Sequence, residues 1–388
     1  PNLITGKWTA TMNLTEPHAG SDLSALKTIA EPVGDHYLIR GQKIYITWGE
    51  HDMTDNIVHI VLAPMTDAPL GNKGLSLFLV PKFLVNEDGS LGERNDVRVM
   101  STEHKLGIHA SPTCVMSFGE NGGAIGYLIG EPGDGLACMF TLMNHARLEV
   151  GLQGVALSER AYQDALGYAK ERVQGRDAET GEASAIIHHA DVQRMLMCMK
   201  SLTEAMRGLT YDGAFAHDFR IHGKDEDEKR HFNERFALLT PLVKAWCTEL
   251  VNEVTSIGIQ VHGGMGFIEE TGAAQHYRDA RISSIYEGTN GIQANDLVGR
   301  KVLRDQGAAL GSYLEEILET AARIESDERL KPIAVKLKEA VSNLQSASHY
   351  VIEKAPSSQK FVGAVAYNFL MMMGYVAGAW YMARSAEK

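Results

Sequence analysis

Residues 260–267 have the sequence QVHGGMGF, and residues 278–293 have the sequence RDARISSIYEGTNGIQ. A glycine cluster that ends a long helical pattern permits a close turn and exposes backbone N–H groups. Glu287 then stands between an aromatic residue and a glycine, before a helix that should begin near Thr289. An apolar neighbour raises the proton affinity of a carboxylate, and a glycine beside it lets a substrate carbonyl approach backbone N–H groups. This stretch therefore predicts a general base at Glu287.

Long helical patterns precede and follow this stretch. Each repeats apolar residues at intervals of three and four, and they cover residues 136–174, 183–217, 232–262, 308–326, 332–346 and 350–386. Pro241 is expected as a kink or an early break in the third of them. Long helices with short connections imply an antiparallel bundle.

Two segments of the helical part invite a second interpretation. Residues 222–235 are dense in charged side chains and histidine, but no two histidines there have the i, i+4 spacing of metal ligands, so a solvated loop or helix end is favoured. Residues 361–383 carry no charge and are long enough to cross a bilayer, with Gly374 and Gly378 in G-x-x-x-G spacing. Their tyrosines, Asn368 and small residues favour a helix buried among other helices.

The first third of the chain has a different period. Short β-rich runs, separated by turn residues, lie at 8–14, 37–47, 56–63, 75–80 and 114–118. This pattern predicts an antiparallel sheet or barrel. The fold class is therefore α+β, with the β part first and the helical part after it.

Composition excludes several classes of function. The chain has 388 residues, with 37 basic and 49 acidic side chains and a net charge of −12, which makes a nucleic-acid backbone an unfavourable partner. Its four cysteines are far apart and form no C-x-x-C pair, so a disulfide framework or thiolate zinc site is not expected, and no metal is predicted. We expect a reducing compartment. The first residue is Pro1 rather than methionine, so we expect the native start to lie upstream.

Two further motifs lie in the β part. Residues 15–22, TEPHAGSD, follow an alternating strand and combine small with hydrogen-bonding groups. Residues 44–49, IYITWG, end another strand with an aromatic side chain and a hydroxyl that can flank a planar ring.

Together TEPHAGSD, IYIT, QVHGGMGF and RDARISSIYEGTNGIQ resemble the acyl-CoA dehydrogenase family, in its order and near its spacing, over about residues 6–300. The family's members are flavoproteins that oxidise acyl-CoA thioesters to trans-2-enoyl-CoA. The resemblance implies FAD as cofactor, a middle β-barrel domain (1–130), a C-terminal four-helix bundle with the base (131–303), and an additional helical extension (304–388). It also implies that the family's N-terminal helical domain is missing from this sequence.

Site residues follow from the same resemblance. Glu287 matches the catalytic base. Positions that match cofactor contacts are Met12, Leu14, Thr15, Tyr45, Ile46, Thr47, Arg172, Gln260, Gly263, Gly264, Thr289 and Gly291. Positions that match substrate contacts are Ser21, Asn144, Arg147, Tyr286 and Gly288. Three departures stand out, because the family more often has tryptophan at Tyr45, phenylalanine at Gly175 and aspartate at Asn144.

The resemblance also implies partners. They are an acyl-CoA substrate, an electron-transfer flavoprotein as electron acceptor, and a second copy of the chain, in a homodimer or homotetramer whose subunits share FAD contacts. The charged segment and the helices after Arg300 are similar to a larger bacterial branch that includes fatty acyl-CoA and 3-methylthiopropanoyl-CoA dehydrogenases. A bacterial cytoplasmic location is expected, without membrane contact.

Two alternatives stay open. One is an acyl-CoA oxidase, which shares the glutamate, the flavin and the fold. The other is an inactive helical assembly or membrane-surface homologue. A nitroalkane oxidase relative is disfavoured, since it would carry aspartate where Glu287 stands.

Overall fold

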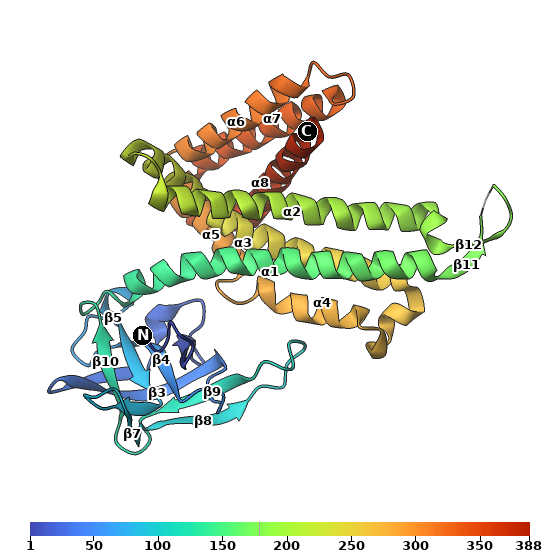
Figure 1. Cartoon of the computed structure of the whole chain (residues 1–388). Coiled ribbons are helices and arrows are strands. Elements are labelled where there is room, and N and C mark those ends of the chain that lie inside the picture. Colours follow the sequence, from blue (N-terminus) through green and yellow to red (C-terminus); the bar gives the residue numbers. More distant parts are fainter. Residues whose placement is uncertain (178) are drawn as a thin grey trace. The chain divides into compact units, whose positions relative to one another are not determined.

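The computed structural model describes residues 1–177 and 179–388, and the chain divides into two compact units, 1–143 and 144–388. The first unit is built on a sheet of eight strands in the order β1-β4-β5-β10-β3-β9-β8, with β2 paired to β3 (Figure 1). These strands are β1 Trp8–Asn13, β2 Ile29–Val33, β3 His36–Thr47, β4 Asn56–Pro64, β5 Leu75–Pro81, β8 Val97–Thr102, β9 Thr113–Phe118 and β10 Ala124–Ile129.

The sheet is mixed rather than wholly antiparallel, which corrects the prediction from sequence. β1 and β4 pair in parallel, whereas all the other pairs in this sheet are antiparallel. A parallel pair needs a long connection, and here the chain passes through β2 and β3 before it returns to β1 as β4.

The sheet curls at β3, a strand of 12 residues. Its first part pairs with β10 and its second part with β9, and the register shifts between Lys43 and Ile46. Tyr45, inside this bulge, has a left-handed φ of 62°. A bulge bends and twists its strand, so this one re-aims the residues that follow it.

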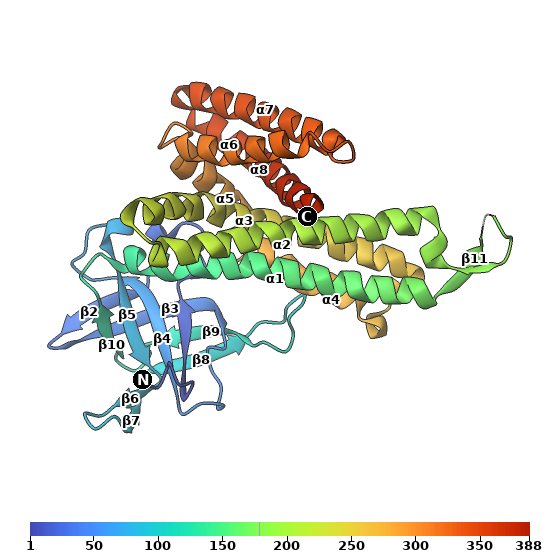
Figure 2. The ribbon, with the colours of Figure 1, turned by 45° about the horizontal axis from the view of Figure 1, so that its top comes forward.

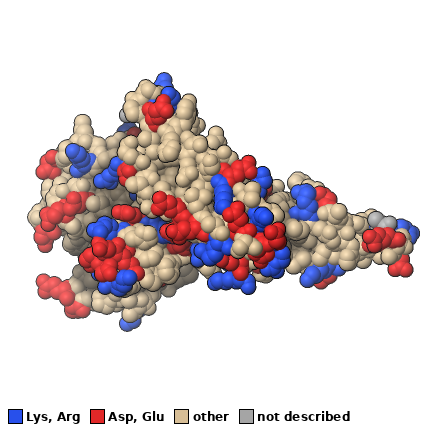
Figure 3. All heavy atoms as spheres, turned by 90° about the horizontal axis from the view of Figure 1, so that it is seen from above, with Lys and Arg blue, Asp and Glu red and all other residues tan. Residues whose placement is uncertain are grey.

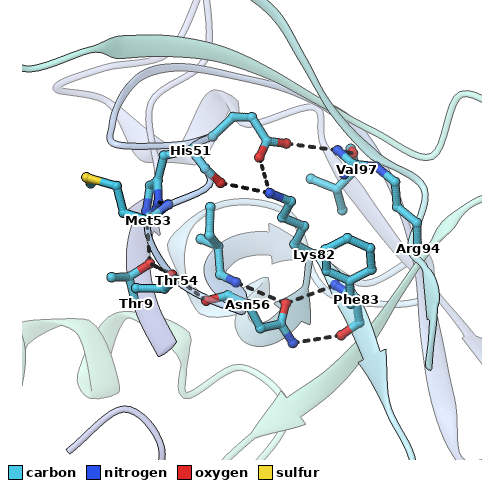
Figure 4. Close-up of polar contacts among 11 residues, drawn as sticks. Thr9, His51, Met53, Thr54, Asn56, Lys82, Phe83, Arg94 and Val97 are labelled. Carbon is cyan, nitrogen blue, oxygen red and sulfur yellow. Dashed lines mark hydrogen bonds and ion pairs between the residues drawn. The ribbon is translucent and has the colours of Figure 1, made fainter. Parts of the chain in front are cut away.

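A small hairpin, β6 Phe83–Val85 with β7 Leu91–Arg94, is tied to the loop after β3 (Figure 4). The Glu50 carboxylate pairs with Lys82 and, at 2.8 Å, with Nη2 of Arg94. Lys82 Nζ also donates to the carbonyl of His51 at 2.9 Å. This polar cluster holds the loop that follows Tyr45 and Trp48.

The second unit consists of helices. α1 Gly135–Glu171 begins in the first unit and continues into the second. The others are α2 Ala190–His222, α3 Glu226–His262, α4 Ala273–Arg281, α5 Asn290–Asp296, a π-helix Leu297–Val302, α6 Ala308–Ile324, α7 Lys331–Lys354 and α8 Gln359–Glu387. The connection from α1 to α2 carries a hairpin of β11 Val173–Arg176 and β12 Ala183–Ala185. Figures 1 and 2 show α2 and α3 running side by side.

Several predicted helix limits are wrong, each for a local reason. The second helix starts at Ala190 and not at residue 183, because residues 183–185 pair with β11. The charged segment 222–235 is mostly helix: α3 starts at Glu226, and Asp225 caps it by accepting a hydrogen bond from the Glu228 N–H at 2.9 Å. Pro241 lies inside α3, so the early break is wrong, whereas a kink at Pro241 stays a prediction. Residue 350 belongs to α7, which ends before Pro356.

The helix predicted over the apolar segment packs as expected against other helices. A Cβ atom at Gly374 or Gly378 would lie 2.2 Å and 2.6 Å from the indole of Trp246, so the two glycines of α8 receive this side chain of α3. By length and composition alone, the helix over residues 360–387 would also pass as a membrane span, since an 18-residue window in it has a mean hydropathy of 1.4. One face of α8 is buried in the helical core.

A partly buried ionic cluster joins the C-terminal helices to α2 and α3. Arg235 Nη2 pairs with Asp212 at 2.8 Å, and its Nη1 donates to Glu316 of α6 at 2.6 Å. The hydroxyl of Tyr381 in α8 also donates to Asp212.

Charges on the molecular surface are mixed: on the face shown in Figure 3, basic and acidic side chains are interspersed.

Candidate active site

The chain between α4 and α5 holds Glu287 in an unusual backbone conformation. Glu287 and Gly288 have φ values of 54° and 86°, two consecutive left-handed residues. A Cβ atom at Gly288 would lie 2.4 Å from Nε2 of Gln293, so glycine is required there for space as well as for φ. A left-handed non-glycine residue costs about 1–3 kcal/mol and persists only where its surroundings impose it. The surrounding structure therefore holds Glu287 in a conformation that it would not adopt by itself.

The helix that follows fixes this loop from its C-terminal side. α5 is capped by Thr289, whose hydroxyl oxygen accepts a hydrogen bond from the Ile292 N–H at 3.3 Å. Thr289 and Gly291, both predicted cofactor contacts, thus lie at the first turn of α5, directly after the glutamate.

The Glu287 carboxylate is shielded from solvent. Its Oε2 atom is buried and has no hydrogen-bond partner among the described residues. Burial raises the pKa of Glu287 above its ordinary value, while Arg147 and Lys244 act in the opposite direction. A carboxylate with raised proton affinity and an unused lone pair is suited to accept a proton from carbon.

The predicted substrate contacts of the helical unit gather around this glutamate. Arg147 Nη1 donates to Asn144 Oδ1 at 3.3 Å, and a Cβ atom at Gly288 would lie 3.7 Å from Arg147 Nη2. The hydroxyl of Tyr286 donates a hydrogen bond to Oε1 of Gln153. Burial raises the pKa of this hydroxyl, and the nearby charge of Glu287 raises it further. The structure therefore brings Asn144, Arg147, Tyr286, Gly288 and Glu287 together.

Behind the glutamate lies a buried polar group that sequence reasoning missed. Lys244 in α3 is fully buried, and its Nζ donates to Oδ1 of Asn290 at 3.0 Å. Burial lowers the pKa of Lys244 to about 7. Gln293 is also fully buried, and neither its amide nitrogen nor its oxygen has a partner among the described residues. The signal in the sequence was a single lysine in the apolar run 238–247, LLTPLVKAWC.

A second set of predicted cofactor contacts lies where α1 and α3 end. The rings of Tyr168 and His262 are 4.5 Å apart, which places the end of α1 beside the end of α3. Arg172, Gln260, Gly263 and Gly264 are all exposed there, and nothing lies within 4 Å of a Cβ atom built on either glycine. Phe267, 85% exposed, follows them. This end offers open backbone and apolar surface to a ligand or to another chain.

A third set lies in the β unit. The Ile44 N–H donates to the Thr15 carbonyl at 2.9 Å, so the TEPHAGSD segment and the IYIT segment are joined. Tyr45 is 62% exposed, and Thr47 and Ser21 are exposed as well. The side chain of Ile46 is only 2% exposed and packs in the sheet core, so only its backbone is left for a ligand. Met12 and Leu14 pack partly against the apolar cluster at the start of α1.

An ion pair that sequence reasoning missed fixes this third set. Lys43 is fully buried and its Nζ donates to the Leu14 carbonyl, Glu16 Oε1 and the Leu62 carbonyl at 2.9, 2.9 and 2.8 Å. Burial lowers the pKa of Lys43 to about 8. Burial alone would raise the pKa of Glu16, but Lys43 and backbone N–H donors hold it below its ordinary value. The buried Lys43 ammonium group thus holds the segment that carries Leu14 and Thr15 in place.

In the described ranges 1–177 and 179–388, no group of three or more His, Cys, Asp or Glu side chains is arranged to hold a metal ion. The four cysteines are free.

Three protein-family models match this chain. They are the acyl-CoA dehydrogenase middle domain at residues 11–120, the acyl-CoA dehydrogenase C-terminal domain at 133–302, and the acetyl-CoA dehydrogenase C-terminal-like domain at 313–388.

Curated relatives and solved structures agree with these matches. A 3-methylmercaptopropionyl-CoA dehydrogenase of Ruegeria pomeroyi is 48% identical over 388 residues, which cover 99% of this chain and 65% of the relative. The CarC subunit of the caffeyl-CoA reductase-Etf complex of Acetobacterium woodii is 30% identical, over 75% of this chain and 68% of that protein. Caenorhabditis elegans ACDH-11, solved with C11-CoA, has the same fold, with a TM-score of 0.79, 24% identity, and coverage of 97% of this chain and 61% of that one.

Proposed function

The chain belongs to the acyl-CoA dehydrogenase family, and from this premise we propose that it catalyses the α,β-dehydrogenation of an acyl-CoA thioester to trans-2-enoyl-CoA with Glu287 as the base. The observation that carries the proposal is the strained, sheltered Glu287 carboxylate beside Arg147. The chain spans 65% of the length of the Ruegeria relative, so the activity of the whole protein is a proposal.

The residues of this chain would have distinct roles in the reaction. Glu287 accepts the α-proton as the substrate forms its new carbon–carbon double bond. This proton is only weakly acidic, so the thioester carbonyl must be polarised while the proton leaves. The Glu287 N–H donates to no acceptor among the described residues, so it can donate to a carbonyl oxygen of the substrate. Asn144 and Arg147 would bind the CoA part of the substrate.

FAD is the proposed cofactor. When bound, it would supply the acceptor for the β-hydrogen and its electron pair at N5, which balances the loss of the α-proton to Glu287. The residues present fit this group: Tyr45 offers an exposed planar face next to Thr47, and the backbone at Thr15 is joined to the same strand. The open backbone at Gly263 and Gly264, together with Arg172, fits a polar part of the cofactor held by a neighbouring copy.

The substrate and the assembly are finer proposals. We propose an acyl group of the size of 3-methylmercaptopropionyl, supported by the 48% identity to the Ruegeria enzyme. An electron-transfer flavoprotein is the proposed electron acceptor, supported by the Etf complex to which the CarC relative belongs. A homodimer or homotetramer is supported by the exposed Met265 and Phe267 at the end of α3. We retain α1–α4 as a four-helix bundle, the division at 130 and 303, and a bacterial cytoplasmic location as proposals.

Flavin colour tests the function directly. Purified full-length protein should be yellow, and an anaerobic addition of 3-methylmercaptopropionyl-CoA should bleach the flavin absorption. A series from butyryl-CoA to long-chain esters would then define the acyl group. Rapid reoxidation in air with stoichiometric peroxide would instead identify an acyl-CoA oxidase, and a protein that neither binds FAD nor reacts with any ester would contradict the proposal.

A further inference from the structure

We propose that Lys244 is a positioning residue for the base, and that its buried ammonium group keeps Glu287 ionised and holds the loop that carries it. This inference rests on the proposed function, because it assigns a role in the same site. It adds a residue that none of the predicted contacts includes.

The geometry begins with the burial of Lys244. The side chain is inaccessible to solvent, and an ammonium group has three N–H donors. Among the described residues one acceptor receives them, Oδ1 of Asn290 at 3.0 Å. An ionised group buried in this way is costly unless a charge of opposite sign lies close by. Glu287 acts on Lys244 as a charge of that sign, and its Oε2 has no hydrogen-bond partner among the described residues.

Asn290 connects the lysine to the loop. Its Oδ1 also accepts a hydrogen bond from Thr248 Oγ1 at 3.0 Å, and its Nδ2 donates to Glu249 Oε2 at 2.8 Å. Asn290 is the first residue of α5 and is separated from Glu287 only by Gly288 and Thr289. The contacts with α3 therefore fix the chain just after the two left-handed residues.

The charges that face the pair come from several elements. Arg147 of α1 lies near both groups, and Glu249 lies on α3. The charges of Asp296 in α5 and Arg300 in the π-helix act electrostatically on Arg147. The hydroxyl of Tyr286 lies near the charge of Glu287. Tyr367 of α8 contacts Glu249. Of the cations that oppose protonation of Glu287, Lys244 is the one whose own pKa, about 7, lies in the physiological range.

The sign of the effect follows from this arrangement. A positive charge near a carboxylate favours the ionised form and lowers its pKa. Replacement of Lys244 by methionine removes that charge and keeps most of the side-chain volume. The pKa of Glu287 should then rise by about 1 unit, in the range that a nearby opposite charge produces.

The first experiment measures the rate of anaerobic flavin reduction by acyl-CoA against pH in the FAD-loaded full-length protein. In Lys244→Met the acidic limb of this profile should move to higher pH by about 1 unit, with KM little changed. Lys229→Met is the matched control, since Lys229 lies on the same helix, pairs with Glu226 near the surface, and should leave the profile in place. An unshifted profile in Lys244→Met would overturn the proposal.

A second measurement needs neither FAD nor turnover and applies even if Lys244→Met does not fold. The folded-state pKa of Lys244 lies below its unfolded value, so the free energy of unfolding rises with pH between the two values. Glu287→Gln removes the compensating charge, so this rise should begin at lower pH than in the unsubstituted protein. Identical pH profiles of urea unfolding would show that the two groups are not coupled. If no ester reduces the flavin, the proposed function fails while this measurement still tests the pair.

Discussion

Gly374 of α8 lies against the indole ring of Trp246 in α3, so closely that a Cβ atom at Gly374 would stand 2.2 Å from Cδ1 of the ring. The G-x-x-x-G spacing of Gly374 and Gly378 is therefore used to receive a buried tryptophan. In this chain the pattern joins the C-terminal helices to the helix that carries Lys244.

Gly374→Ala should destabilise the helical unit. The added methyl group has no space, and overpacking of a core costs about 1–3 kcal/mol. Urea unfolding followed by circular dichroism measures the loss. Gly363→Ala is the matched control in the same helix, because nothing lies within 4 Å of its Cβ position, and alanine there should stabilise α8 slightly. Equal stability of the two variants would contradict the packing.

Glu287→Gln should abolish rapid flavin reduction. The amide keeps the shape of the side chain but has no basic oxygen, and loss of a general base lowers a rate by about 10²–10⁴-fold. Stopped-flow absorbance under anaerobic conditions measures the rate, and the urea midpoint reports folding. Glu270→Gln serves as control at an exposed position and should behave as the parent. A Glu287→Gln variant with the parental rate would mean that another group removes the proton.

The rate of flavin reduction should also depend on pH through Glu287. Only the carboxylate accepts a proton, and burial raises the pKa of Glu287 above its ordinary value. The rate should therefore fall as pH decreases through a midpoint above that of an exposed glutamate, near 4.3. A midpoint at or below 4.3 would contradict the burial of the carboxylate.

Lys43→Met should loosen the β unit. It leaves the Glu16 carboxylate buried without its cation and removes the donor of the Leu14 and Leu62 carbonyls. Removal of one member of a buried ion pair costs about 3–5 kcal/mol. Urea unfolding and hydrogen exchange at residues 14–22 measure the change. The double variant Glu16→Gln/Lys43→Met should recover part of the stability, and the absence of any recovery would exclude the pair as the cause.

Local signals in the sequence were sufficient for much of this fold. The apolar period placed α6 at Ala308, and the Tyr-Glu-Gly-Thr motif placed α5 directly after Thr289. The limits that were wrong depend on pairing elsewhere in the chain. Residues 183–185 form a strand only because β11 is there to pair with them, and β1 lies parallel to β4, which is far from it in sequence. Asp225, followed by acidic residues, is the N-cap of α3. This is a known helix-start signal, but the high charge of the segment favoured a solvated loop or helix end in the prediction.

The residues of the candidate site that belong to a sequence motif were predictable. Those whose role depends on three-dimensional packing were not. Glu287, Gly288 and Arg147 came from motif positions and lie together. Lys43, Lys244 and Gln293 did not, since each is a polar residue whose role depends on what three-dimensional packing buries beside it. A single lysine in an apolar run was the visible signal, and a buried cation without an evident partner is reason to look for one.

Gly288→Ala should lower the rate of flavin reduction more than it lowers stability. Two effects act at this position. Alanine disfavours the left-handed φ of 86°, at a cost of about 1–2 kcal/mol, and its Cβ would lie 2.4 Å from Nε2 of Gln293. Relief of either effect by movement of the loop displaces the neighbouring Glu287, and a displaced base loses the orientation on which proton transfer depends.

A second substitution separates the two effects. Gly288→Ala/Gln293→Ala removes the clash and keeps the strain, so it should recover part of the rate lost by Gly288→Ala, measured against Gln293→Ala alone. Gly299→Ala is the control for backbone changes, because Gly299 has no left-handed φ and nothing within 4 Å of its Cβ position. If the double variant is as slow as Gly288→Ala, the left-handed backbone alone positions the base. If both retain the parental rate, the conformation of this loop does not control proton abstraction.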